Sequence, residues 1–201
     1  MSDKEPVMEE MNDPTAWVAE LCEASDGTCP SGLLEEVMAD PRCDAFGPIH
    51  HFIVGAVLLT CYRNALGGAD RDERLQADLE ELRQRSAIVP GAACAYWGVC
   101  GAAASAGMAH AIIRGNEPLE KEGWSEGQSM VARILAEIAK TGAPRCCKRD
   151  SRIAVASATR AFNDLFGCDM QTLGVLPLCK TMPKNTVCLG STCPYHPRRA
   201  S

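Results

Sequence analysis

The sequence predicts an all-α protein, in which a single globular helical domain is followed by an irregular, cysteine-rich C-terminal tail. Several segments repeat apolar residues with helical spacing, and none shows the clear alternation of a half-buried strand. Aromatic residues make up only 5% of the 201 residues, so small and aliphatic side chains must fill the interior. We expect a flexible N-terminus over residues 1–12, the helical domain over 13–166, and a tail over 167–201 that packs on it.

Three helices are expected in the first third of the chain. Asp13 and Pro14 are typical of a helix cap and a first helical residue. A short helix should follow near residues 32–39 and end before Pro41. Residues 49–66 are apolar on nearly every side, which predicts a buried central helix.

Four more helices complete the predicted domain. Residues 71–85 carry a leucine stripe on a charged background, which indicates a surface helix. Residues 98–114 form a helix with a face of glycine and alanine, which permits another backbone to approach closely. An amphipathic helix covers residues 124–140, and a last helix runs from a cap at Asp150 or Ser151 to about residue 165.

Charge and hydropathy exclude several classes of function. The net charge of −6 and the pI of about 5.3 argue against a nucleic-acid-binding protein, which needs clustered Lys and Arg. The longest apolar stretch, residues 52–61, is far shorter than the roughly 20 residues of a membrane span. No secretory signal precedes it. The sequence therefore predicts a cytoplasmic protein that acts on a small molecule, and a homodimer is left open.

The sequence contains 12 cysteines. In a reducing cytoplasm such a number indicates metal binding or catalysis rather than disulfides. The alternative is that cysteines serve as small buried hydrophobes, which is the preferred interpretation for Cys22, Cys61 and Cys168 taken singly. That interpretation does not account for all twelve.

Two cysteine groups lie at predicted helix starts, Cys94 with Cys100 and Cys146 with Cys147. The unpaired N–H groups and positive dipole end of a helix N-terminus stabilise a thiolate, the form that binds metal. If the two helix starts face one another, they make a pocket for an anionic cluster or a carboxylate. The alternative is that these cysteines only pack where helices meet.

The tail holds a third group, Cys179, Cys188, Cys193 and His196. Three cysteines and a histidine suit a zinc site, although the paired CxxC spacing of zinc knuckles is absent. Alternatively, one tail cysteine completes a cluster begun by the helix-start cysteines.

His50 and His51 follow Gly47-Pro48 in the first turn of the predicted central helix. A helix N-terminus disfavours the imidazolium form, so a neutral ring able to accept a proton or bind metal is expected. Adjacent helical residues point about 100° apart, so at most one of the two should face a given site. The alternative is a pair of satisfied core histidines.

Over its whole length the chain resembles an uncharacterised family of cysteine-rich proteins from anaerobic microbes, some of them fused to methyltransferase domains. The resemblance is carried by Gly47-Pro48-x-His50-His51, by the block from Cys94 to Cys100 and by Cys146-Cys147. It implies a fused or associated methyltransferase as a partner and names no activity.

Residues 91–165 are also similar to the helical cluster-binding domain of iron–sulfur L-serine dehydratases and cysteine desulfidases. Cys94 precedes a Gly- and Ala-rich stretch, and Cys146-Cys-Lys-Arg149-Asp150 opens an Ala-rich helix, as in those enzymes. The Cys-Asp-Pro motif and the acidic residue of their first motif are missing. A third cluster ligand must therefore come from Cys100, Cys147 or the tail.

This second resemblance implies a [4Fe–4S] cluster on three cysteines, with one open iron acting as a Lewis acid. The protein would then be a lyase or desulfidase, or another sulfur-transfer enzyme. Arg149 would clamp a substrate carboxylate, and His50 or His51 would act as the base. The alternative function is a zinc-binding structural or regulatory protein that uses the tail.

Overall fold

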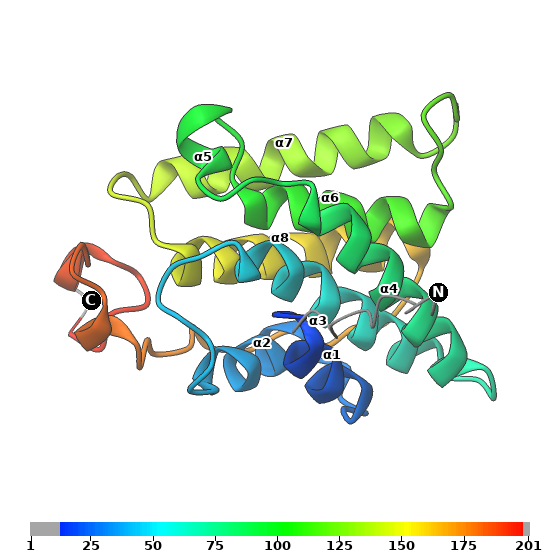
Figure 1. Ribbon diagram of the computed structural model, residues 1–201, viewed down its shortest axis with the longest axis horizontal. Helices are drawn as coiled ribbons and strands as arrows, with labels where there is room; N and C mark the ends of the chain where they lie inside the picture. Colours follow the sequence, from blue (N-terminus) through cyan, green and yellow to red (C-terminus); the bar gives the residue numbers. More distant parts are fainter. Residues whose placement is uncertain (1–12, 199–201) are drawn as a thin grey trace, which may run out of the picture.

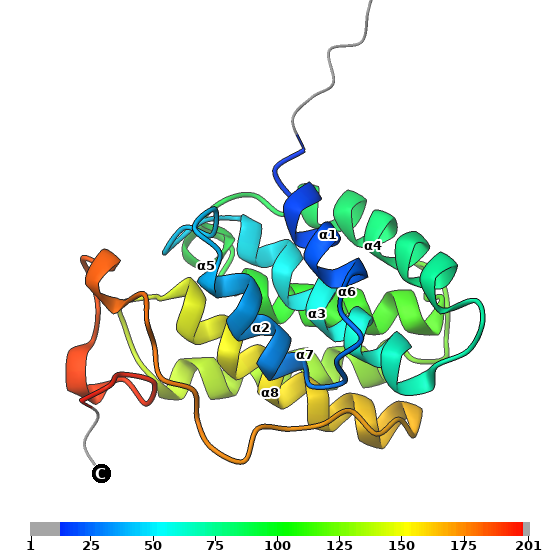
Figure 2. The same cartoon turned by 90° about the horizontal axis from the view of Figure 1, so that it is seen from below.

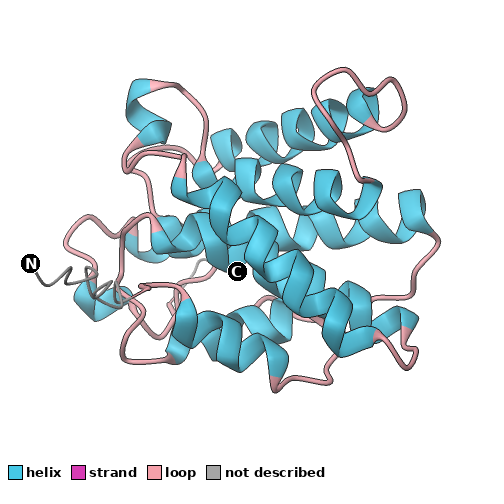
Figure 3. Ribbon diagram, turned by 45° about the vertical axis from the view of Figure 1, so that its right-hand side comes forward, coloured by secondary structure: helices cyan, strands magenta, loops and turns pink. Residues whose placement is uncertain are grey.

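The computed structural model describes residues 13–198, and in this range it contains eight α-helices, two short 3-10 helices and no strand (Figures 1 and 3). The predicted all-α fold is confirmed. Residues 1–12, predicted as a flexible N-terminus, lie outside the described residues. The helices are α1 (Ala16–Glu23), α2 (Pro30–Ala39), α3 (Ile49–Leu66), α4 (Arg71–Ala87), α5 (Ala93–Tyr96), α6 (Gly101–Arg114), α7 (Trp124–Lys140), α8 (Cys147–Phe166), η1 (Met182–Lys184) and η2 (Gly190–Thr192).

Helix α3 is the centre of the fold. It contacts α1, α2, α4, α6 and α8, and every residue from His50 to Tyr62 is buried. A helix that is apolar on all sides has no polar face that could be exposed to solvent, so the other helices pack around it. The predicted central helix is thereby confirmed.

Helices α3 and α6 approach closely, as the glycine and alanine face predicted. The N–H of Gly55 donates to the Ser105 hydroxyl at 2.8 Å inside the core. A Cβ at Gly55 would lie 2.7 Å from a methyl carbon of Leu82, so no larger residue fits there without a shift. Four alanines of α6 are buried, namely Ala102, Ala103, Ala106 and Ala109.

Several helix ends differ from the sequence predictions. Helix α1 begins only at Ala16, because the Asp13 carboxylate accepts hydrogen bonds from the N–H and hydroxyl of Thr15 in a turn before the helix. Gly98 adopts a positive φ of 69°, so α6 begins at Gly101 instead. Helix α8 begins at Cys147, and Asp150 is therefore a residue of its first turn rather than its cap.

The tail returns from the end of α8 towards its beginning. Figure 2 shows residues after 167 running back along the outside of the bundle to the end where α8 starts. Leu176 and Tyr195 line one cavity there together with Leu34 of α2 and Arg152 of α8. None of the helices between residues 13 and 198 has the length and apolar character needed to cross a membrane.

Candidate functional site

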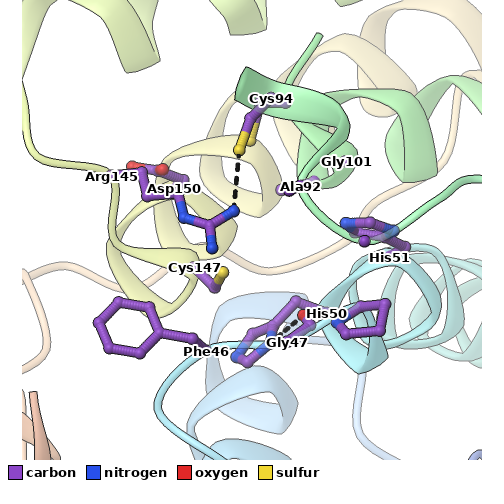
Figure 4. Close-up of a pocket in the computed structure, with 14 residues that line it drawn as sticks. Phe46, Gly47, His50, His51, Ala92, Cys94, Gly101, Arg145, Cys147 and Asp150 are labelled. Carbon is purple, nitrogen blue, oxygen red and sulfur yellow. Dashed lines mark hydrogen bonds between the residues drawn. The ribbon is translucent and has the colours of Figure 1, made fainter. Parts of the chain in front are cut away.

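A cavity of about 230 Å³ lies at the end of the bundle where three helices begin. Its walls come from the starts of α3, α6 and α8 and from the loop that contains α5 (Figure 4). The polar and sulfur-bearing residues that line it are His50, His51, Cys94, Cys100, Arg145, Cys147 and Asp150.

Three of the predicted cluster ligands share this cavity. Cys94 lies in α5, Cys100 is the N-cap of α6 and Cys147 is the first residue of α8. The two helix starts therefore do face one another, as the sequence suggested. Beside them, the guanidinium of Arg145 donates a hydrogen bond to the Cys94 sulfur at 3.2 Å (Figure 4).

Burial works against the expectation that the helix starts hold Cys100 and Cys147 as thiolates, and that expectation stays a prediction. Burial raises the pKa of Cys100 to about 11, and backbone N–H groups of α6, at Ala102 and Ala103, lower it only in part. Burial likewise raises the pKa of Cys147. Desolvation thus outweighs the helix N-terminus. Metal binding to these thiols would release protons.

His50 lines the cavity with a ring nitrogen that has no hydrogen-bond partner. Its Nδ1 lies 3.1 Å from the backbone carbonyl of Gly47, which can only accept, so the hydrogen is on Nδ1. Its Nε2 is buried without a hydrogen-bond partner. Burial, helped by the nearby charge of Lys148, lowers the pKa of His50 to about 4. The ring is therefore neutral, with a lone pair on Nε2, which is the usual state of a metal-binding histidine.

His51 also lines the cavity, so the expectation that at most one of the two histidines faces a given site is wrong. The ring of His51 packs directly against Gly101, where a Cβ would overlap it. Its Nδ1 is buried without a partner, and burial lowers its pKa.

Arg149, predicted to clamp a carboxylate, does not line this cavity. Its guanidinium donates to the carbonyls of Gly142 and Pro144 at 3.1 and 3.2 Å and to Asp150 at 3.0 Å, so it holds the loop before α8. Arg145 supplies the cation of the cavity instead. The sequence analysis missed Arg145 as a site residue, and the available signal was its position two residues before Cys147.

Cys146 is separated from the other three helix-start cysteines. It has an extended backbone, with φ −143° and ψ 107°, whereas Cys147 is already helical. The adjacent side chains therefore diverge, and Cys146 lines a second cavity of about 20 Å³. That cavity gathers all four predicted tail ligands, Cys179, Cys188, Cys193 and His196.

All twelve cysteines are free thiols. Among residues 13–198, no three His, Cys, Asp or Glu side chains converge closely enough to hold one metal ion. Each of the two cavities is therefore lined by several candidate ligands, but their side chains do not surround a common point.

Residues 18–196 match a protein family described as "Family of unknown function (DUF5714)". The match spans most of the chain. The chain belongs to this family. No curated protein and no solved structure matches it. The prediction that the chain belongs to an uncharacterised family is confirmed. The anaerobic source, the methyltransferase fusion and the likeness to iron–sulfur dehydratases stay predictions.

Proposed function

We propose that Cys94, Cys100 and Cys147 bind a [4Fe–4S] cluster in the 230 Å³ cavity, and that the protein is an enzyme acting on a small molecule. The observation that supports this most is that three thiols, from two segments about fifty residues apart in sequence, line one cavity together with His50, whose Nε2 has no hydrogen-bond partner. A buried polar atom without a partner is uncommon in proteins and calls for an explanation.

Three thiols around one cavity suit a cluster, which takes each thiolate on a different iron. Three cysteines also leave one iron without a thiolate, and that iron would supply Lewis-acid chemistry.

The remaining side chains have roles that follow from their chemistry. The cation of Arg145, beside Cys94, offsets the negative charge of a thiolate-bound cluster and attracts an anionic substrate. His50, neutral and with a lone pair on Nε2, accepts a proton from the substrate. This set suits a lyase or sulfur-transfer reaction on a small carboxylate. The many free thiols suit the reducing cytoplasm.

Anaerobic purification followed by iron and sulfide analysis tests the proposal. We expect a brown protein, and we expect the variants Cys94→Ala, Cys100→Ala and Cys147→Ala to lose both elements. Cys168→Ala is the matched control, because Cys168 follows the opposite end of α8 and should leave the cluster intact. An iron-free wild-type protein, or a Cys147→Ala variant with full iron, would show the proposal to be wrong.

A further inference from the structure

The second cavity, between the start of α8 and the tail, is separate from the site proposed above. Its volume of about 20 Å³ is close to that of one water-sized sphere. It is therefore the size of a single ion and too small for a cluster or an organic substrate. Four cysteine side chains line it, and they come from both parts of the chain, as Cys146, Cys179, Cys188 and Cys193.

The tail has little else to hold it in place. Between residues 177 and 198 only Cys193 and Tyr195 are buried, and regular structure is limited to η1 and η2. One backbone hydrogen bond, from the N–H of Cys179 to the carbonyl of Tyr195 at 2.7 Å, closes this segment into a loop. Segments without a core of their own are commonly held by disulfides or metals, and the tail cysteines form no disulfide.

Hydrogen bonding argues against His196 as a ligand. The N–H of Arg198 donates to Nδ1 of His196 at 3.0 Å, so the neutral ring carries its hydrogen on Nε2. That tautomer is the reverse of the one found at His50 and leaves no lone pair on Nε2. The donor set that remains is four thiols, and tetrahedral sulfur coordination is typical of zinc.

The surroundings suit thiolates bound to zinc. Arg149 and Arg152 line the cavity and place positive charge beside the thiols, although Asp150 pairs with Arg149 and Glu35 pairs with Arg152. Donors also point at the sulfurs. The Asn185 amide donates to Cys146 at 3.5 Å, and the N–H of Gly190 donates to Cys188 at 3.4 Å. Such outer hydrogen bonds orient metal ligands.

We propose that Cys146, Cys179, Cys188 and Cys193 bind one structural zinc ion that fastens the tail to the start of α8. The four sulfurs do not yet surround a common point, so zinc binding requires cysteine side chains to rotate inward. The vicinal pair Cys146-Cys147 then serves two sites, with one residue facing each cavity. His196, predicted from the sequence as a zinc ligand, is replaced by Cys146.

Zinc analysis and X-ray absorption of the purified full-length protein test this proposal. We expect one zinc per chain and a first shell of four sulfurs at about 2.3 Å. Cys146→Ala and Cys193→Ala should lose the zinc, whereas His196→Gln and the control Cys168→Ala should keep it.

Three results would overturn the proposal. These are a zinc-free wild-type protein, a nitrogen atom in the zinc shell, and full zinc in Cys146→Ala. The absorption measurement needs only the wild-type protein, so it decides the ligand set even if a variant fails to fold. Cys94→Ala should keep its zinc, and this result separates the present site from the proposed cluster site.

Discussion

At the residue scale, the sequence identified most of the side chains at the cavity but not their states. His50, His51 and the cysteines stand out by residue type and by their place at helix starts. The tautomer of His50 depends on the Gly47 carbonyl, and the protonation of Cys100 depends on burial. Both depend on the folded surroundings, so the residue types alone could not reveal them. Arg145 was missed although it stands two residues before Cys147.

Gly101 is predicted to be essential for the cavity wall, because its missing side chain makes room for the ring of His51. We expect Gly101→Ala to destabilise the protein by about 2 kcal/mol, since either the ring or α6 must shift. Denaturant unfolding measures this change.

Gly91→Ala is the matched control for this substitution. Gly91 lines the same cavity, but a Cβ there meets nothing within 4 Å. Equal stability of the two variants would contradict the close packing of His51 against α6.

At the element scale, hydrophobic periodicity predicted seven of the eight α-helices in residues 13–198 but placed several of their ends wrongly. The ends depend on single turns. Gly98 and Ala92 adopt positive φ values, which delimit α5 and α6, and no periodic pattern encodes such a turn. Among these helix ends, the start of α8 at Cys147 has the largest effect on the candidate sites, because Cys146 and Cys147 line different cavities as a result.

The ion pair between α3 and α4 should contribute strongly to the packing of these helices. Arg63 donates to both carboxylate oxygens of Asp78, at 2.6 and 3.0 Å, and both side chains are largely buried. We expect Asp78→Ala to lower the free energy of unfolding by about 3 kcal/mol, because it leaves the Arg63 charge buried and unpaired. Denaturant unfolding measures the loss.

Asp70→Ala provides the comparison for that prediction. Asp70 pairs with Arg74 within one helix turn, and both side chains are more than half exposed. Its removal should cost much less than that of Asp78, because solvent screens an exposed ion pair. Similar losses for the two variants would show that the α3–α4 pair has no special role.

At the scale of the whole molecule, the fold class followed from the sequence, whereas the division of the cysteines into two cavities did not. That division depends on contacts between residues such as Cys94 and Arg145, which are far apart in sequence. It also depends on the path of the tail back to the start of α8. A single sequence carries no signal for such long-range pairings.

Acid should destabilise the whole protein between pH 7 and pH 5. Burial lowers the pKa of His50 to about 4 and also lowers the pKa values of His51 and His110. An unfolded histidine titrates near pH 6.5, so in this window the unfolded chain binds more protons and stability falls as the pH falls. His50 alone should cost about 2 kcal/mol by pH 5.

Chemical denaturation at pH 7, 6 and 5 measures this loss. His110→Leu, in which one buried ring no longer titrates, should show a shallower pH dependence. A wild-type stability that stays constant from pH 7 to pH 5 would contradict the burial of neutral histidines.

The central claim is that two neighbouring cysteines belong to two different inorganic sites. Its most direct test is an iron and zinc analysis of Cys146→Ala beside Cys147→Ala, both purified without oxygen. The account predicts that Cys147→Ala loses iron and keeps zinc, and that Cys146→Ala loses zinc and keeps iron. Loss of the same metal from both variants would contradict it.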